Sequence, residues 1–453
     1  MAQVNSPYSR FGLGNIFPAT FSSANGMGGQ SAAYFTTTNI NFLNPASYAE
    51  FTNATFEIGG YGNVLKLETN TENYTSGDGN LSYMAFGFPF LRKLHNHYFG
   101  MSFGLIPYSG FEYDVVEQQD SGDPDLGIKQ YDYVGDGKVY RVYGGVGYKF
   151  QTKIDSSWKF TDSLQTDTLW KYKADQFSVG INASALFGNL RATTIASFPD
   201  IISSQDTKLS NDTRVNGSLF QYGIGYQKQY IRKPESKKYR DVLVWRFGAY
   251  ASPAMDLDAR QNILWTNIVK SGNYEFPTDT LYMAPDTAGF IHMPLSYSAG
   301  AGFSFFSTSE DKNMFSIYAQ YEATKWSGYS GFQDAGELAD SWRISLGAEF
   351  IPKNPGNDKK ITRSVVIRAG AYTGYSNVVV DGEQLKEGGG TLGVSIPIGV
   401  GKNSIPILRY STINLYTNIG SRGNTDTIRE TYYRFGVGFT LVDSNWFKKY
   451  LQD

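Results

Sequence analysis

Apolar residues alternate with small or polar residues along most of the chain after residue 54. Between residues 295 and 305 every odd position is apolar and every even position is Ser or Gly. Segments 99–105, 177–187, 342–350 and 433–441 alternate in nearly the same way. Successive side chains of a β-strand point to opposite faces, so this period predicts strands with one apolar face and one small or polar face.

The pattern predicts an all-β protein, a transmembrane antiparallel β-barrel of about 14 strands. The segments often exceed 12 residues, whereas strands of a soluble sandwich usually have about 5–6, and aromatic residues near their ends suit interfacial girdles. We favour the membrane barrel over a soluble all-β fold, and an even strand number allows closure. The predicted strands are 54–68, 79–90, 97–116, 136–151, 175–193, 212–230, 240–252, 288–308, 313–325, 341–352, 363–377, 389–399, 407–420 and 429–442.

The links between these strands alternate in length. We interpret the shorter set as periplasmic turns and the longer set as extracellular loops. The short links are 91–96, 231–239, 309–312, 352–361 and 400–406, and the long ones are 117–135, 251–287 and 325–340. Link 151–174 breaks the rule, since it belongs to the periplasmic set yet is long; we expect a small extra hairpin there.

Composition supports strands and excludes several classes of protein. The chain has 49 Gly, and aromatic residues make up 16%. A net charge of −2 gives no positive field that would favour binding of nucleic acid. The absence of Cys excludes disulfides and thiolate metal sites. No run approaches the roughly 18 apolar residues of a membrane-spanning helix. The opening Met-Ala-Gln resembles the residues around a signal cleavage site, so we expect a mature sequence with an added methionine.

Residues suited to catalysis or metal binding are sparse. The three histidines are His95, His97 and His292, which leaves little for a hydrolase site. The glycine run 388–390 lacks the Lys that a phosphate loop needs. The aspartates within 120–125 lack the spacing of a calcium loop, so we interpret them as a solvated loop. We therefore expect no enzyme, no cofactor and no metal.

Residues 1–53 do not alternate and are rich in Gly and other small residues. We interpret them as an irregular plug, or hatch, inside the lumen, ahead of a barrel formed by residues 54–453 with a short C-terminal extension. Within this segment Pro45 fixes its own φ and holds Asn44 extended, while the Asn side chain can bond nearby backbone. Asn44, Pro45 and Ala46 thus predict a rigid corner where the plug turns into the first strand.

Three stretches of this segment resemble the FadL-type family of outer-membrane transporters. They are Arg-Phe-Gly-Leu-Gly at 10–14, the small-residue run 26–33, and Asn-Pro-Ala at 44–46, in that order before the first long strand. The residues at 44–48, Asn-Pro-Ala-Ser-Tyr, and those of the tail at 445–450 resemble the sequences of the Bacteroidetes branch of this family. The chain runs past its last strand, and beyond the plug no residues match the family's fatty-acid contacts.

The resemblance implies passive uptake of hydrophobic, fatty-acid-like molecules by lateral diffusion, across the outer membrane of a Gram-negative bacterium. A ligand would pass the plug and leave through a kink in a strand into the surrounding outer-membrane lipid. Candidate plug residues facing the lumen are Phe11, Phe17, Phe21, Met27, Phe35 and Phe42, although plain packing explains them equally well.

A second function stays open. The barrel would be a non-transporting subunit of a larger secretion or barrel-assembly complex, with other envelope proteins as partners. Links 151–174 and 251–287 and the tail after Asp443 are candidate docking surfaces.

Overall fold

The structure, a computed structural model, describes residues 6–17, 20–94, 96–123, 127–152, 156–161, 167–201, 205–234, 241–272, 274–307, 313–332, 338–352, 365–398 and 411–443. Asp125 and the tail at 445–450 lie outside this described part. No helix within it is long and apolar enough to cross a membrane.

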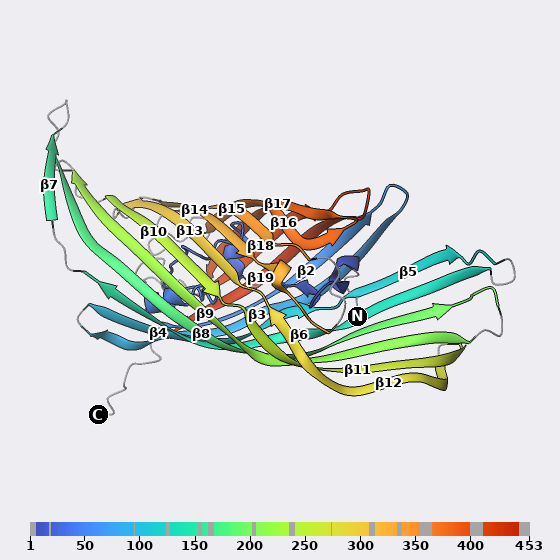
Figure 1. Cartoon of the computed structure of the whole chain (residues 1–453). Helices are drawn as coiled ribbons and strands as arrows, with labels where there is room; N and C mark the ends of the chain where they lie inside the picture. The colour runs from blue at the N-terminus through green and yellow to red at the C-terminus, as the bar shows by residue number, and fades with distance from the viewer. Residues whose placement is uncertain are drawn as a thin grey trace.

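Strands dominate the chain (Figure 1). The N-terminal segment contains the short helices η1 (Pro7–Arg10), α1 (Ser22–Asn25) and η2 (Pro45–Glu50) and a two-residue strand, β1 (Asn15–Ile16). A third 3₁₀ helix, η3 (Trp326–Gly328), follows β14. The longer strands are β2 (Ala54–Glu68), β3 (Asn73–Leu94), β4 (His97–Gly110), β5 (Tyr113–Asp120), β6 (Ile128–Gln151), β7 (Ser156–Thr161), β8 (Asp167–Ser197), β9 (Asp206–Pro234), β10 (Asp241–Ser252), β11 (Met255–Ser271), β12 (Tyr274–Met293), β13 (Ser296–Ser307), β14 (Met314–Thr324), β15 (Ser341–Ile351), β16 (Val366–Val380), β17 (Glu383–Ile398), β18 (Ser411–Arg422) and β19 (Arg429–Asp443).

The wall is an antiparallel sheet that closes on itself, because β19 pairs with β2 along its whole length. At three places around the wall, two consecutive strands together take the place of one. β4 and β5 both pair with β6, and β10 and β11 both pair with β9. At the next place along, β12 pairs with β11 and β13 pairs with β10. β7 pairs only with the start of β8. In the described part of the chain the wall thus has 14 positions, and the predicted closed barrel is confirmed.

An apolar belt covers the outer face of this wall. On β8, Phe177 and Val179 are about half exposed, while Ser178 and Asn182 on the inner face are buried. The same division recurs around the barrel, on β4, β13, β17 and β19 among others. An outer surface of exposed large apolar side chains over a polar interior is the pattern of a transmembrane barrel.

The long links differ from the prediction. Most of 251–287 is a hairpin of β11 and β12, and β5 and β6 occupy much of 117–135, so interpreting these segments as loops was wrong. The prediction failed because Pro277, Pro285 and three register irregularities interrupt the alternation of the hairpin. Link 151–174 contains β7 paired with β8, and the predicted extra hairpin is confirmed.

Six strands continue beyond the barrel rim as one projecting sheet. Figure 1 shows β5, β6, β8, β9, β11 and β12 running together past the end of β2 and β3. We call this part the extracellular sheet, after the predicted orientation of the long links.

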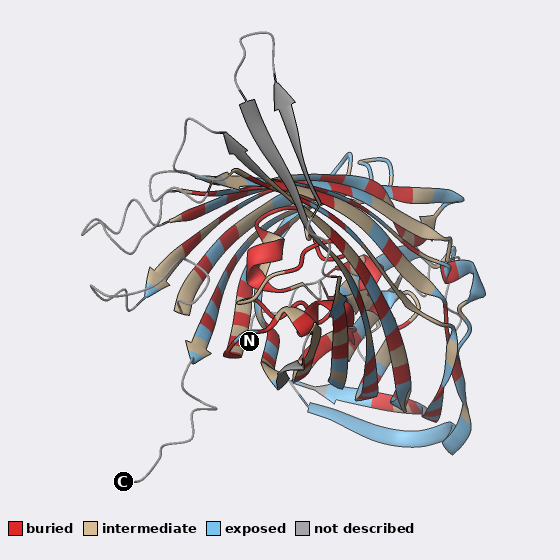
Figure 2. Cartoon of the chain, turned by 90° about the vertical axis from the view of Figure 1, so that its left-hand side faces the viewer, coloured by how far each residue is buried: buried red, intermediate tan, exposed pale blue. Residues whose placement is uncertain are grey.

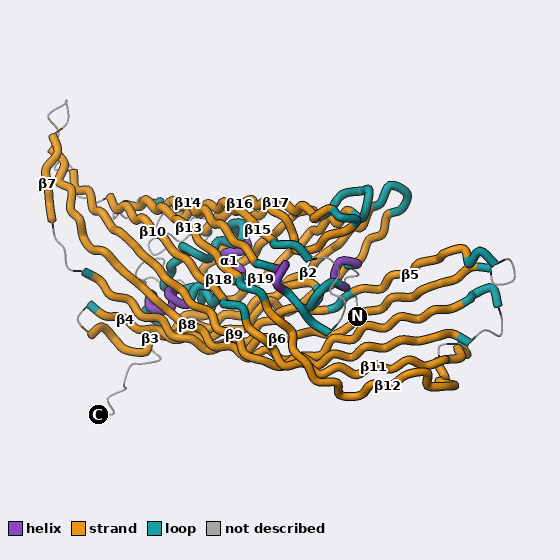
Figure 3. Tube along the Cα trace, viewed as in Figure 1, coloured by secondary structure: helices purple, strands orange, loops and turns teal. Residues whose placement is uncertain are grey.

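The N-terminal segment lies within the barrel. Figure 2 shows its buried residues, in red, enclosed by the wall, and Figure 3 shows it as loops and short helices. Wall side chains bond its backbone: Gln320 Oε1 accepts from the nitrogens of Ser31 and Ala32 at 2.7 and 2.8 Å, and Thr391 Oγ1 accepts from Gly28 at 2.8 Å. These bonds matter because buried backbone groups without partners are costly. The expected irregular segment does form short helices, since Asn44 and Pro45 occupy the first positions of η2.

A row of wall glycines receives η2. The glycines are Cα partners on four successive wall strands, namely Gly100, Gly147, Gly180 and Gly223. A Cβ on Gly180 would lie 2.6 Å from the Ala46 nitrogen, and one on Gly147 would lie 2.6 Å from the Pro45 oxygen. Only a wall without side chains at these positions leaves room for the helix.

A second glycine platform receives residues 26–28. It is formed by Gly347 of β15, its Cα partner Gly370 of β16, and Gly393 of β17. The Cα of Gly26 would lie 2.7 Å from a Cβ on Gly393. Gly28 adopts φ +73°, which L side chains rarely adopt. The small-residue run of the sequence is therefore needed for close contact between two backbones.

Replacing Gly180 by Ala tests this packing. The added methyl meets backbone atoms that cannot rotate away, so we expect docking of η2 to weaken by about 1–3 kcal/mol. Amide hydrogen exchange in detergent should then become faster at 40–51 while the strands stay protected. Gly144→Ala on β6 is the matched control, because its methyl would meet nothing within 4 Å. Equal exchange in the two variants would contradict the packing.

Candidate functional site

A cavity of about 460 Å³ remains between the N-terminal segment and the wall. Residues from β2, β4, β6, β9, β10 and β12 to β19 reach it, together with parts of the N-terminal segment. It is much smaller than the barrel, because the N-terminal segment fills most of the lumen. The volume of the cavity lies within the range of about 300–1,000 Å³ that is typical of small-molecule sites.

One side of the cavity, which we call the apolar side, has apolar residues around Arg141 of β6, whose guanidinium donates to Ser184 at 2.9 Å and to Gln221 at 3.0 Å. Ile106 and Tyr108 of β4 contribute to it, as do Leu219 of β9 and the N-terminal residues Ile16 and Phe17. Tyr108 is the extra residue of an irregularity in the β4–β6 ladder, where Pro107 pairs with Tyr140 and Ser109 with Val139. Pro cannot donate to the ladder, so a bulge at this point is physically expected.

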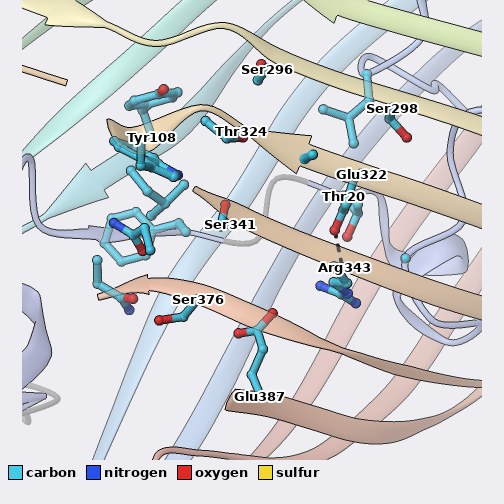
Figure 4. Close-up of a pocket in the computed structure, with 18 of the residues that line it drawn as sticks. Thr20, Tyr108, Ser296, Ser298, Glu322, Thr324, Ser341, Arg343, Ser376 and Glu387 are labelled. Carbon is cyan, nitrogen blue, oxygen red and sulfur yellow. Dashed lines mark ion pairs between the residues drawn. The ribbon is translucent and has the colours of Figure 1, made fainter. Parts of the chain in front are cut away.

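The opposite side carries charges on β14 to β19. Arg343 Nε lies 3.5 Å from Glu322 Oε1, its terminal nitrogen donates to the Gly28 oxygen at 3.1 Å, and its guanidinium lies 3.9 Å from the centre of the Tyr372 ring. Figure 4 shows the Arg343–Glu322 pair with Glu387 nearby and Tyr108 on the far side.

Two further arginines complete the charged side. Arg422 donates to Glu430 Oε2 at 2.6 and 2.9 Å, and Ser6 donates to the other oxygen of Glu430 at 2.6 Å. The guanidinium of Arg434 lies 4.9 Å from the Tyr61 ring centre. No salt bridge joins Arg434 to another described residue, and its buried Nε has no hydrogen-bond partner there. Asp78 acts on Arg434 through space but forms no salt bridge with it. An anionic group entering the cavity would therefore meet a cation with a free hydrogen-bond donor.

A polar clamp holds the rim of the cavity at η3. Lys325 Nζ lies 2.7 Å from Asp340 Oδ2, and both the backbone nitrogen and the hydroxyl of Ser327 donate to the other Asp340 oxygen. The Lys325 and Ser327 bonds hold the pKa of Asp340 below its usual range. Trp326 and Ser341, which flank this clamp, line the cavity.

The barrel wall opens beside the apolar side of the cavity. β3 pairs with β4 only from Met84↔Leu105 to Leu94↔His97, and beyond Met84 it pairs only with β2 among the described strands. β1 lies against β4 in the space left free, with Ile16 opposite Ser109. We call this place the β3–β4 seam. Side chains also span it: Lys138 Nζ of β6 lies 2.5 Å from Asn80 Oδ1 of β3 and 3.1 Å from Glu112.

The corner at 44–46 is built as a helix start. Asn44 is extended, with φ −117° and ψ 95°, and its side chain accepts a bond from the Ala46 nitrogen at 3.2 Å. Its Nδ2 donates to the oxygens of Ala32, at 2.7 Å, and Ile224 of β9, at 3.2 Å. Asn44 thus connects two parts of the N-terminal segment to the wall. Pro45 and Ala46 are buried.

The six candidate ligand residues occupy different environments. Phe17 lines the cavity. Phe21, Met27 and Phe42 are at most 1% exposed and belong to the largest buried cluster, where Phe42 packs on Tyr83 and Tyr143. Phe35 packs against Gly225, and Phe11 packs on the cluster of Tyr8, Val378 and Leu385. These five do not line the cavity, and a role in ligand binding stays a prediction for all six.

Sequence reasoning missed the charged residues of the cavity. Arg343 and Arg434 stand at inward positions of alternating segments, and an Arg among inward Ser and Gly residues was the available signal. No group of three or more His, Cys, Asp or Glu residues able to hold a metal occurs in the part of the chain that the structure describes.

A sequence model of the BamG family matches residues 1–160 and 171–452. The chain belongs to the BamG family. The match spans both the N-terminal segment and the wall. Together with the closed barrel, membership of the BamG family points to the outer membrane of a Gram-negative bacterium. No curated protein matches this BamG-family chain.

Solved structures similar to this BamG-family chain include two toluene transporters and a FadL homologue. The toluene transporter TbuX of Ralstonia pickettii is 14% identical, with 94% of this chain and 99% of that one covered, at a TM-score of 0.49. A FadL homologue of Pseudomonas aeruginosa is 12% identical, with 94% and 99% covered, at 0.47. The toluene transporter TodX of Pseudomonas putida is 12% identical, with 95% and 98% covered, at 0.44. The predicted resemblance to FadL-type transporters is confirmed; the Bacteroidetes branch stays a prediction.

Replacing Asn44 by Ala tests the corner. Loss of its side chain removes the donor to two buried carbonyl oxygens, at a cost of about 1–3 kcal/mol. We expect the N-terminal segment to become cleavable by added protease at a lower temperature than in the parent, with the barrel intact on a gel. Asn53→Ala is the control, since the Asn53 side chain bonds its neighbour Thr52 at 3.2 Å. Identical cleavage temperatures would contradict the assignment.

Proposed function

We propose that the protein is an outer-membrane barrel for passive uptake of hydrophobic, fatty-acid-like small molecules. In this proposal residues 1–53 act as the plug and residues 54–453 as the barrel. The observation that carries it is the position of the cavity at the β3–β4 seam, where Ile106 and Tyr108 of β4 line the cavity. A molecule held there has a short way to the lipid outside the wall.

The lining of the cavity supports an amphiphilic ligand. An apolar chain suits Ile16, Ile106 and Leu219. An anionic head suits Arg434 on the other side, whose Nε has no hydrogen-bond partner among the described residues, whereas Arg141 already donates to Ser184 and Gln221. Movement needs no energy input, because an apolar molecule in the cavity is stabilised by leaving it for lipid. No catalytic step enters the proposal.

Passage through the seam requires β1 to leave β4. β1 is held by two residue pairs, Asn15↔Gly110 and Ile16↔Ser109, far fewer than any wall strand. A strand pair of this length is weak, because each net hydrogen bond contributes about 1 kcal/mol. Release of residues 15–17 would open the seam without unfolding the wall.

A disulfide between Ile16→Cys and Ser109→Cys tests this route. The two residues are Cα partners, a spacing that permits a disulfide, and the chain has no other cysteine. We expect the oxidised variant to reduce uptake of a radiolabelled long-chain fatty acid by intact cells to the level of cells without the protein. Reduction should restore uptake.

The control disulfide joins Thr194→Cys and Leu209→Cys, Cα partners on β8 and β9 in the extracellular sheet. It leaves the seam free and should not change uptake. Full uptake by the oxidised 16–109 variant would contradict passage at the seam.

The extracellular sheet favours a second function, a barrel subunit of a larger outer-membrane complex. The far part of its distal hairpin, β11 with β12, lies outside the closed wall: there β11 pairs with β9 and β12, and β12 pairs with no further strand among the described residues. A surface that extends from the barrel without forming its wall is suited to contact other envelope proteins.

Shortening this hairpin separates the two functions. Gln261 and Thr287 are Cα partners, so replacing residues 262–286 by Asn-Gly should join the strands in a two-residue turn. We expect the shortened protein to insert and to take up the fatty acid as before, but to lose envelope partners in native gels of gently solubilised membranes. Unchanged complexes would contradict a role of the hairpin in assembly.

A further inference from the structure

The β11–β12 hairpin exposes a cluster of large apolar side chains in its outer half, short of the turn that follows Ser271. We call it the hairpin patch and define it as Leu264, Trp265, Val269, Leu281, Tyr282 and Met283. Their exposed fractions range from 38% for Val269 to 62% for Met283. Leu264 pairs with Met283 and Trp265 with Tyr282, so the patch covers both faces of the hairpin. Contiguous exposed apolar side chains on a folded protein mark a site of interaction.

Lipid does not account for the patch. Between the apolar belt of the barrel and the hairpin patch, β8, β9 and β11 carry polar side chains on their outer faces. Arg191 donates to Asp212 at 2.9 Å, and Arg260 forms an ion pair with Asp286. Asp256 and Asp258 on β11 extend this polar zone. The apolar belt of the barrel therefore ends below the patch, and charged side chains separate the two.

Another copy of the chain joined edge to edge does not account for it either. β12 is an edge strand of the extracellular sheet, because among the described residues it pairs along the hairpin only with β11. Pro277 and Pro285 interrupt its free edge, and the β11–β12 ladder has three irregularities. Prolines and bulges are devices that prevent strand addition. A partner at this edge can therefore bind through side chains, but not by adding a strand to the sheet.

The other edge of the same sheet shows the contrast. β5 is exposed as well, but its outer half is Glu-Gln-Gln-Asp at 117–120, with a single exposed large apolar residue, Val116. Such an edge is protected by charge. The hairpin patch has Trp, Tyr and Met instead, residue types enriched where proteins bind one another.

Charge around the patch indicates the chemistry of the partner. β12 carries Glu275, Asp279 and Asp286 and no Lys or Arg. Glu275 is paired with Lys208 and Asp286 with Arg260, whereas no salt bridge to Asp279 forms within the described part of the chain. A Lys or Arg of a partner can therefore bind Asp279 at the border of the patch.

We propose that the hairpin patch is the docking site of a separate envelope protein, which covers it with an apolar surface and places a Lys or Arg opposite Asp279. The inference deepens the second function proposed above and is independent of passage through the cavity. The occupant is neither lipid nor a second copy of the chain.

Hydroxyl-radical footprinting tests the proposal, because Trp, Tyr and Met are readily oxidised where they are exposed. We expect oxidation of Trp265, Tyr282 and Met283 to be several-fold lower in native outer membranes than in the purified chain in detergent. Tyr74, exposed at the tip between β2 and β3, is the internal reference and should react equally in both. Equal oxidation of the patch in both preparations would overturn the proposal.

Two additions to the purified chain separate the occupants. Protein-free vesicles of the organism's lipids, or a higher concentration of the chain itself, should leave the patch reactive. Protection by either one overturns the assignment of a separate protein.

Substitutions then identify the contact. In native membranes Met283→Asp should restore oxidation of Trp265 and Tyr282 and release the partner, whereas Val116→Asp on β5 should do neither. Asp279→Lys should weaken the association several-fold, and an unchanged association would overturn the basic contact. If the shortened hairpin loses its partners while the patch is equally oxidised in both preparations, the docking site lies elsewhere on the hairpin and only this inference fails.

Discussion

The structure depends on the approach of one backbone to another inside the barrel. The N-terminal segment can lie against the wall only where the wall has no Cβ, at the row from Gly100 to Gly223 and at the platform of Gly347, Gly370 and Gly393. Because the segment then shields the inner face from water, its backbone groups need wall partners. Gln320, Thr391 and other inward side chains provide them.

The cavity follows from the same packing. The segment fills the lumen near η2 and α1 but leaves space between β4 on one side and β15 to β19 on the other. The apolar and charged sides of that space come from different parts of the chain, which is why it suits a molecule with two unlike ends. At the β3–β4 seam, β1 and the contacts of Lys138 replace the missing backbone ladder.

Much of the barrel could be predicted from sequence. A strand with lipid on one face and the crowded lumen on the other must alternate between apolar residues and small or polar residues. Segment 295–305 shows this directly: its apolar positions face out, and its Ser and Gly positions face in. The hairpin of β11 and β12 could not be predicted in this way. β12 is exposed on both faces for most of its length, so no environment imposed a period of two on it, whereas β11 has one buried face.

The candidate site was less accessible to sequence reasoning. Isolated aromatic residues in the N-terminal segment signal burial, but not its direction: Phe17 lines the cavity, whereas Phe21 lies in the buried cluster. The function of the glycines at 26–28 depends on wall glycines more than 300 residues later in the chain, a relation that no local pattern contains.

The most direct test of the account is native mass spectrometry of the protein purified in mild detergent from its own outer membrane. The account predicts a chain that retains an amphiphilic small molecule with an acidic head, and an Arg434→Ala variant that has lost it. Chains that carry no small molecule in every preparation, with uptake unaffected by Arg434→Ala, would contradict a role of the cavity in uptake.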